Sequence, residues 1–295
     1  MGRVQPARVN SDTGTRDTAS RATHRSDTHR GDTYTHGHHE SVLRSLEWRT
    51  AENSAAYLLP HLRPGMDLLD VGCGPGTITL DLAQRVTPGR VLGIDNAAGV
   101  VDAAQRRASD QGDDTTRFET GDVYRLDVPD SYFDVVHAHQ VLQHLTAPVA
   151  ALREMRRVCR PGGLVAVRDS DYATMTWFPA NGGLTNWLDL YHRVARGNNA
   201  EPDAGRELRS WALRAGFDDV RCSASAWTFA TPDERAWWGS LWADRCLHSA
   251  FATQALAGGH ATKSQLTDIA AAWQAWAAVD DAWFAILHAE VLAVA

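Results

Sequence analysis

The segment LLDVGCGPGTITLDLA, residues 68–83, is the strongest constraint on how this chain folds. An apolar run ends at Asp70, and glycines follow at alternate positions, Gly72, Gly74 and Gly76. The residues after them have the apolar spacing of a helix. Glycine allows a sharp turn and a close approach of the backbone to a ligand, and a helix N-terminus attracts anionic groups. The segment therefore predicts a strand, a ligand-binding turn and a helix.

Apolar strands alternate with amphipathic helices from the strand before this loop onward. Strands are expected at MDLLDVG, GRVLGID, TTRFETGD, SYFDVVHAHQ and LVAVRDSD, and helices at GTITLDLAQRV, AAGVVDAAQRRASD and PVAALREMRRVCR. Such alternation predicts a doubly wound α/β fold, in which helices cover both faces of a parallel sheet. Ligands of these sheets bind beyond the carboxyl ends of the strands.

The glycine spacing separates two classes of nucleotide-binding enzyme. A dinucleotide loop reads G-x-G-x-x-G, but here the third glycine comes one residue early and Asp70 precedes the first. The loop thus departs from the nicotinamide pattern, and a nicotinamide dehydrogenase is the less favoured alternative.

The loop resembles motif I of class I S-adenosylmethionine-dependent methyltransferases, D-x-G-x-G-x-G. Two further acids stand where that family has them, Asp95 at the end of VLGID and Asp122 in FETGDV. FDVVHAHQVLQHL and ALREMRRVCRPGGLVAVRD are similar to later motifs of the ubiquinone and menaquinone methyltransferase subgroup. The resemblance covers residues 67–169, and several motifs at family spacing make it specific.

The resemblance implies methyl transfer from S-adenosylmethionine to a small organic metabolite, with S-adenosylhomocysteine as product. It also implies a Rossmann-like sheet of seven strands, mostly parallel, closed by an antiparallel last strand at WFAILHAEVLAV. Asp95 would accept hydrogen bonds from both ribose hydroxyls, and Asp122 and the Val123 N–H would bind the adenine. The residues expected to bind the cofactor are Asp70, Gly72, Cys73, Gly74, Gly76, Asp95, Asn96, Asp122, Val123, His139, Tyr34 and Arg49.

Candidate acceptor-site residues follow the fourth and fifth strands. Methyl transfer from a sulfonium is a direct displacement that depends on positioning and on exclusion of water. His139 and His144 are the candidate catalytic bases, since histidine is the commonest base, although each could instead only bind backbone. Asp169 and Tyr172 could orient a polar acceptor or cap the next helix, and Trp177 could form an apolar wall.

No metal ion is expected in the reaction. Catechol-type methyltransferases carry an aspartate at the end of the fourth strand, where this chain has histidine. The N-P-P-Y motif of enzymes acting on planar nitrogens is also absent. Both departures favour a small acceptor without a metal, and they leave C-, N- and O-methylation open.

Three histidines, His36, His38 and His39, stand together in YTHGHHESVLRS. A zinc site, a solvated loop and a lid over the cofactor are the three interpretations. The segment before the first strand often forms a lid in the family. On that resemblance Tyr34, His38 and His39 would line the acceptor site, and Arg49 would meet the cofactor carboxylate.

The chain is expected to have four parts. They are a disordered tail (1–33), an N-terminal helical lid (34–64), the methyltransferase core (65–231 and 279–295) and a helical insertion (232–278). The tail lacks the apolar residues that ordering requires. All tryptophans except Trp48 lie at or after Trp177. The insertion that carries many of them could cover the acceptor pocket, form a homodimer contact or pack a core.

Composition argues against several other classes of protein. A net charge of −7 and a pI near 6.0 give no support for a nucleic-acid or anionic-membrane partner. The four cysteines have no paired spacing, and no secretory or membrane-spanning segment is evident. A cytoplasmic enzyme is therefore expected. The alternative function is a non-catalytic cofactor-binding or assembly protein that retains the fold, which the intact motifs oppose.

Overall fold

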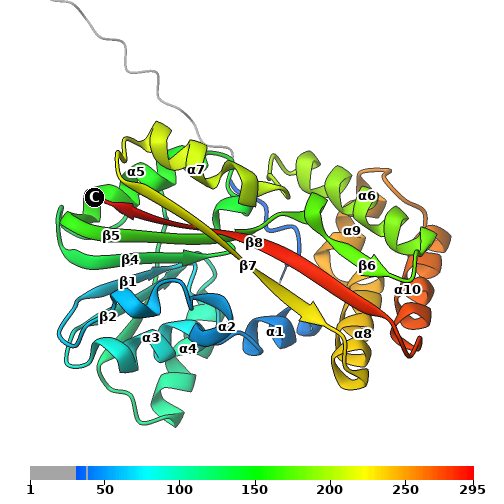
Figure 1. The fold of residues 1–295 in the computed structure, drawn as a ribbon, viewed down its shortest axis with the longest axis horizontal. Coiled ribbons are helices and arrows are strands. Elements are labelled where there is room, and N and C mark those ends of the chain that lie inside the picture. Colours follow the sequence, from blue (N-terminus) through cyan, green and yellow to red (C-terminus); the bar gives the residue numbers. More distant parts are fainter. Residues whose placement is uncertain (1–30, 38) are drawn as a thin grey trace, which may run out of the picture.

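The computed structural model describes residues 31–37 and 39–295 (Figure 1). Residues 1–30 of the predicted tail lie outside this part. Within the remainder of that predicted tail, the Asp32 carboxylate accepts hydrogen bonds from the Thr146 N–H at 2.8 Å and the Tyr124 hydroxyl at 3.2 Å. The chain therefore makes tertiary contacts before residue 34.

Five parallel strands form the part of the sheet that carries the glycine loop. They are β1 (Leu68–Val71), β2 (Val91–Asp95), β3 (Thr116–Thr120), β4 (Phe133–His139) and β5 (Cys159–Ser170), in the order β3-β2-β1-β4-β5. Successive residues of β1 point to opposite faces of the sheet. Leu68 packs in the core on one face, and Leu69 packs in the core on the other. Both faces are thus buried, as the apolar strand pattern predicts.

Helices cover the two faces of this sheet. Those involved are α3 (Thr77–Val86), α4 (Ala98–Asp110), α5 (Pro148–Val158) and α7 (Ala204–Ala215). Figure 1 shows α3 and α4 on one side of the strands and α5 and α7 on the other. The predicted doubly wound, Rossmann-like α/β fold is confirmed.

Within the described residues the sheet has eight strands rather than the predicted seven. The last strand, β8 (Trp283–Val294), pairs antiparallel with β5 as expected, and along its other edge with β7 (Val220–Phe229). The additional strand β6 (Thr176–Phe178) pairs with residues 283–285 of β8. Because β8 extends beyond the end of β5, it offers an edge that β6 fills. Three residues are too few for an alternating pattern to be recognised.

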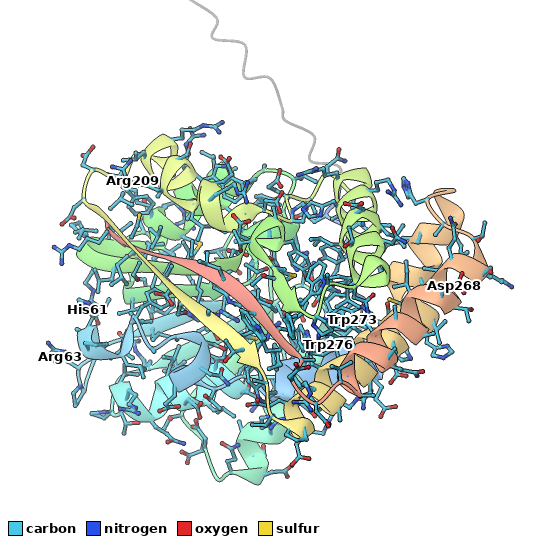
Figure 2. The ribbon with its side chains drawn as sticks, turned by 45° about the vertical axis from the view of Figure 1, so that its right-hand side comes forward. His61, Arg63, Arg209, Asp268, Trp273 and Trp276 are labelled. Carbon is cyan, nitrogen blue, oxygen red and sulfur yellow. The ribbon has the colours of Figure 1, made fainter. Side chains whose placement is uncertain are left out.

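A second hydrophobic core lies between the first half of β8 and four helices. These are α6 (Gly182–Gly197), α8 (Pro232–His248), α9 (Ala250–Ala257) and α10 (Lys263–Ala277). Trp187 meets the rings of Trp242 and Trp273 edge to face, at 4.4 Å and 4.9 Å. Figure 2 shows Trp273 pointing inward from α10 while Asp268 points outward. Residues 232–278 thus pack in the chain's own core, and a homodimer contact on them stays a prediction.

The first part of the predicted helical insertion consists of two helices, α8 and α9, that meet at Ser249. The buried Ser249 hydroxyl accepts a hydrogen bond from the Phe251 N–H at 3.2 Å and donates one to the Arg245 carbonyl at 2.8 Å. These bonds satisfy backbone groups at the end of α8 and the start of α9. The apolar pattern continues across the break, so periodicity alone does not reveal it.

The N-terminal segment lies against both parts of the molecule. It contains α1 (Glu40–Glu47), α2 (Ala51–Ser54) and a 3-10 turn, η1 (Leu59–His61). Helix α1 contacts α8, and α2 contacts α3. Within the described part of the chain, no helix is long and apolar enough to cross a membrane.

Replacing Trp273 by alanine should lower the free energy of unfolding by about 3–5 kcal/mol, because the indole is fully buried and its removal leaves a cavity. Urea denaturation measures the change. Trp283→Ala is the matched control, since Trp283 is 40% exposed and should cost no more than about 1 kcal/mol. Equal losses for the two variants would contradict the aromatic core described above.

Candidate functional site

A cavity of about 450 Å³ lies at the carboxyl ends of β1, β2, β3 and β4. Its volume is in the range of small-molecule sites. Most residues predicted to bind the cofactor line it, together with His144. The predicted residues in this lining are Tyr34, Arg49, Gly72, Gly74, Asp95, Asn96, Asp122, Val123 and His139. We call this space the outer cavity.

The glycine loop borders the outer cavity through its backbone. Gly72, Gly74 and Gly76 have φ values of 66°, 56° and 80°, in the left-handed region that favours glycine. A Cβ at Gly72 would lie 2.4 Å from a Val141 methyl carbon, and one at Gly74 would meet only Leu46, at 4.0 Å. The loop therefore needs glycine for its conformation, and at Gly74 it leaves open space beside the cavity.

Three of the residues predicted to bind the cofactor are not among those that line the cavity: Asp70, Cys73 and Gly76. Asp70 is buried, with its carboxylate 2.8 Å from His137 Nδ1 and accepting a hydrogen bond from the Thr79 hydroxyl at 2.5 Å. Gly76 is the N-cap of α3, and burial raises the pKa of the Cys73 thiol. Asp70 thus joins β1, β4 and α3, which holds the loop in place.

Asp95 and Asp122 are both oriented by backbone donors. Asp95 Oδ2 accepts from the Gly74 N–H at 3.2 Å, and its Oδ1 accepts from the Ala97 N–H at 3.0 Å. Asp122 Oδ1 accepts from the Tyr124 N–H at 2.9 Å. A carboxylate oxygen has two lone pairs, so both side chains keep the capacity to bind a ligand in the outer cavity.

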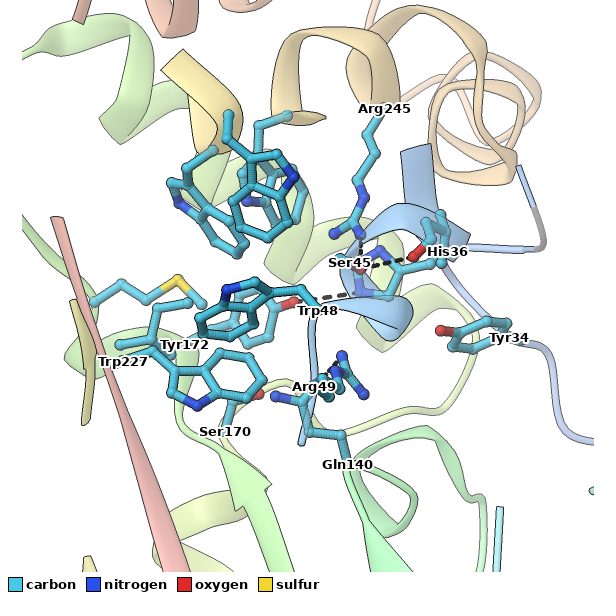
Figure 3. Close-up of a pocket in the computed structure, with 16 residues that line it drawn as sticks. Tyr34, His36, Ser45, Trp48, Arg49, Gln140, Ser170, Tyr172, Trp227 and Arg245 are labelled. Atoms are coloured by element: carbon cyan, nitrogen blue, oxygen red, sulfur yellow. Dashed lines mark hydrogen bonds between the residues drawn. The ribbon is translucent and has the colours of Figure 1, made fainter. Parts of the chain in front are cut away.

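A smaller cavity of about 30 Å³, the inner pocket, adjoins the outer cavity (Figure 3). Tyr34, Arg49 and Gln140 line both spaces. The other lining residues come from the N-terminal segment, the ends of β5, β7 and β8, and helix α8. They are His36, Val42, Ser45, Trp48, Ser170, Tyr172, Met175, Trp227, Trp237, Trp238, Trp242, Arg245 and Ile286. The space holds roughly one or two water molecules.

Arg49 is held between the two spaces by a chain of hydrogen bonds. Its Nη2 donates to Gln140 Oε1 at 2.7 Å, and Gln140 Nε2 donates to His288 Nε2 at 2.8 Å. The guanidinium lies over the Trp227 ring, 5.5 Å from its centroid. Burial lowers the pKa of Arg49 to about 10, so it is still charged at neutral pH. Among the described residues it forms no ion pair.

The two candidate bases, His139 and His144, line the outer cavity. In the part of the chain that the structure describes, neither ring nitrogen of His139 has a hydrogen-bond partner, and burial lowers its pKa well below the usual value. His144 Nε2 is 3.0 Å from Gln143 Nε2, and burial lowers its pKa to about 3. Both imidazoles are therefore neutral at pH 7 and can accept a hydrogen bond or a proton.

His36 is the histidine of the N-terminal cluster that enters the inner pocket. Its Nε2 lies 2.9 Å from the Tyr191 hydroxyl and 3.3 Å from the Tyr172 hydroxyl. Nδ1 is buried and has no hydrogen-bond partner among the described residues. Tyr172 also lines the inner pocket, and its predicted role toward the acceptor stays a prediction.

His39, the next described histidine of the cluster, is not among the residues that line either space. His39 is the N-cap of α1, where Nδ1 accepts from the Ser41 N–H at 3.2 Å. His38 lies outside the described residues. The backbone turns at Gly37, where φ is 64° and a Cβ would lie 2.6 Å from Ala250 Cβ. Because a contact far along the chain sets this turn, the sequence does not reveal which histidine points inward.

Asp169 and Trp177 lie near the inner pocket without lining it. Asp169 is fully buried, and its Oδ1 accepts from the Gln143 N–H at 3.1 Å. Burial raises the pKa of Asp169 to about 7. Trp177 stacks on Phe284 at 5.9 Å.

Several lining residues were not predicted, because they come from separate elements without a local motif. Arg245 and Trp242 belong to α8, Trp227 to β7 and Ser45 to α1. Gln140 follows β4 directly, so its place at a strand end was the one available signal. Among the described residues, no group of three or more His, Cys, Asp and Glu side chains is arranged to hold a metal ion.

Comparison with known proteins defines the class. Residues 62–217 match the family model described as a methyltransferase domain. The chain therefore belongs to the class I S-adenosylmethionine-dependent methyltransferases, as predicted, and the nicotinamide alternative is excluded.

Its relatives include proteins of similar length. The chain is 35% identical over 253 residues to "Uncharacterized methyltransferase C1B3.06c" of Schizosaccharomyces pombe, covering 82% of this chain and 89% of that protein. It is 31% identical over 276 residues to "Probable methyltransferase ltbC" of Aspergillus luteorubrus, covering 88% and 96%. The crystal structure of the YcgJ protein from Bacillus subtilis has the same fold, with a TM-score of 0.55 at 17% identity over 82% of this chain and 98% of that one.

Asp169→Asn should change how stability depends on pH. In the folded protein Asp169 keeps its proton up to about pH 7, whereas an unfolded aspartate loses it near pH 4. The folded state thus loses stability relative to the unfolded state as pH rises through this window. Between pH 5 and pH 8 the wild type should lose up to about 3 kcal/mol relative to the variant.

Urea unfolding of both proteins at the two pH values measures this difference. The buried histidines have lowered pKa values and contribute with the opposite sign. They are the same in both proteins, so their contribution cancels in the comparison. Parallel changes in the wild type and the variant would show that Asp169 is already ionised at pH 5.

Proposed function

We propose that the chain transfers a methyl group from S-adenosylmethionine to a small organic acceptor by direct displacement and without a metal ion. The observation that carries this proposal is the pair of adjoining spaces with a shared wall. The outer cavity has the glycine loop, Asp95 and Asp122, and the inner pocket is enclosed by aromatic rings. The wall between the two spaces contains Tyr34, Arg49 and Gln140, which line both of them.

The outer cavity fits the cofactor through its chemistry. Asp95 would accept hydrogen bonds from the ribose hydroxyls, and Asp122 and the Val123 N–H would bind the adenine. Arg49, charged and without an acidic partner in the described chain, would bind the cofactor carboxylate. Bound S-adenosylmethionine supplies a methyl group on a positively charged sulfur. The protein's part is to orient the acceptor and to keep water away from it.

His139 is the side chain best placed to act on the acceptor. Its ring borders the outer cavity, and both of its nitrogens lack a hydrogen-bond partner among the described residues. The ring centroid lies 5.7 Å from that of Trp227, which lines the inner pocket. A neutral imidazole there would accept a hydrogen bond or a proton from the acceptor. His144 Nε2 already has the Gln143 side-chain nitrogen at 3.0 Å, so His144 would act as a hydrogen-bond partner rather than as a base.

Asp95→Ala should weaken binding of S-adenosylhomocysteine about 10- to 100-fold, because it removes charge-assisted hydrogen bonds worth about 1.5–3 kcal/mol. Isothermal titration calorimetry on the full chain measures the affinity. Asp102→Ala is the control, since Asp102 is an exposed acid on α4 and should bind like the wild type. An Asp95→Ala variant with unchanged affinity would refute the assignment of the outer cavity.

A turnover assay distinguishes the proposed methyltransferase activity from the alternative of a non-catalytic cofactor-binding or assembly protein. The wild type is incubated with S-adenosylmethionine and a small-molecule metabolite extract, and S-adenosylhomocysteine is measured. Formation above the level of the Asp95→Ala variant, and only with extract, is the expected result. Normal cofactor binding without turnover in any fraction would instead support a binding or assembly role.

A further inference from the structure

We infer that the acceptor is a small organic anion whose carboxylate binds Arg245 in the inner pocket, with its apolar, unsaturated body against the tryptophans. This inference rests on the proposed function, because it names the acceptor class of the same site.

Arg245 reaches the pocket from α8 as a buried cation. Its side chain is 4% exposed, and the guanidinium lies 4.9 Å from the centroid of the Trp242 ring. Nη2 donates to the Ser45 hydroxyl and to the Ser41 carbonyl, and Nε has no hydrogen-bond partner. Figure 3 shows the side chain extended toward Ser45 and the pocket. These neutral contacts orient the guanidinium without neutralising its charge.

Other buried arginines of this chain have a compensating group. Arg168 pairs with Glu290 at 3.3 Å, and Arg235 donates to the carbonyl of Ala277 at the C-terminus of α10. A helix C-terminus carries partial negative charge. Arg245 also lies in the last turn of a helix, α8, but its guanidinium donates to Ser41 and Ser45 on α1 and not to the terminal carbonyls of α8. Within the described residues, neither Arg245 nor Arg49 forms an ion pair. A buried charge without a counter-charge is costly in free energy. The guanidinium groups of the two arginines therefore give the pocket a positive charge that no acidic side chain compensates among the described residues.

The polar groups around Arg245 do not supply that charge. Burial raises the pKa values of Tyr34, Tyr172 and Tyr191, so their hydroxyls stay neutral. Burial also lowers the pKa of His36 well below its usual value, so this ring is neutral. The pocket therefore carries net positive charge until a ligand binds. The cofactor carboxylate could balance Arg49 but not Arg245 as well.

The arrangement selects an anion over an ammonium compound. Aromatic cages often bind quaternary ammonium groups through the faces of their rings. Here two of those faces already have cations over them, Arg49 on Trp227 and Arg245 on Trp242. A third positive charge would be repelled, whereas a carboxylate would bind the guanidinium groups and leave the rings for an apolar body.

The inner pocket suits the head group of such a ligand. Its volume of about 30 Å³ is too small for a whole metabolite but admits a carboxylate. His36 Nδ1, in a ring 6% exposed, is a second polar atom there without a partner. In the tautomer with the proton on Nδ1, it would donate to the carboxylate oxygen that Arg245 leaves unpaired. The rest of the acceptor would extend past Tyr34 toward the outer cavity, where the methyl group is delivered.

Three probes of matched shape and different charge test the inference: benzoate, benzamide and benzamidinium. Calorimetry on the full chain saturated with S-adenosylhomocysteine measures the binding of each. Benzoate should bind at least tenfold more tightly than benzamide, and benzamidinium should not bind detectably. Arg245→Met should abolish the preference for benzoate, and Arg245→Lys should keep part of it, because a lysine retains the charge but not the paired donors.

Arg44→Met is the matched control, because Arg44 lies on α1 at the same helix contact and pairs with Asp244 at 2.7 Å. It should retain the full preference for benzoate. S-adenosylhomocysteine affinity in each variant shows that the fold and the outer cavity are intact, with Arg245→Lys deciding if Arg245→Met does not fold. If the wild type does not bind S-adenosylhomocysteine, the proposed function fails. If it does, but benzoate binds no better than benzamide, or benzamidinium binds best, the acceptor inference alone is overturned.

Discussion

Strand β8 belongs to two hydrophobic cores, and the site depends on this. Its first half, with Phe284 and Ile286, packs among the tryptophans, while Val291 and Ala293 pack in the core of the parallel sheet. Between them His288 accepts the hydrogen bond from Gln140 that orients Arg49. A single twelve-residue strand therefore fixes the aromatic helices relative to the glycine loop. Without it the two spaces would have no defined separation.

Charge is distributed unevenly across this arrangement. The outer cavity is bordered by the carboxylates of Asp95 and Asp122, whereas the inner pocket has guanidinium groups and neutral hydroxyls. Arg245 is buried, where electrostatic interactions are stronger than at the surface, whereas Asp95 is half-buried and Asp122 is exposed. The positions of the acids suit the polar hydroxyl and amino groups of a nucleoside. Those of Arg49 and Arg245 suit acidic groups, so with the ligands proposed above the site would distinguish the cofactor from the acceptor by charge.

The parts of the site that were predicted are those whose geometry is local. The glycine loop and the acids at Asp95 and Asp122 follow strand ends, so the α/β alternation was enough to bring them together. Arg245 and His36 depend on the packing of α8 and on the turn at Gly37, which bring distant segments into contact. Strand β6 was missed because three residues are too few to show an alternating pattern, and the break at Ser249 because the apolar pattern continues across it. The spacing of apolar residues indicates which face of a helix or strand is buried, but it does not indicate which other segment packs against that face.

The wall that the two spaces share makes their occupancies interdependent. Tyr34, Arg49 and Gln140 contribute to both, so a ligand in one space fixes side chains that the other ligand must meet. Thermodynamic linkage makes this reciprocal: whatever factor the bound donor adds to acceptor affinity, the acceptor adds to donor affinity. With the ligands proposed above, S-adenosylhomocysteine, which lacks the positive charge of the methyl donor, would hold an anionic product less firmly, and this would favour release of both products after transfer.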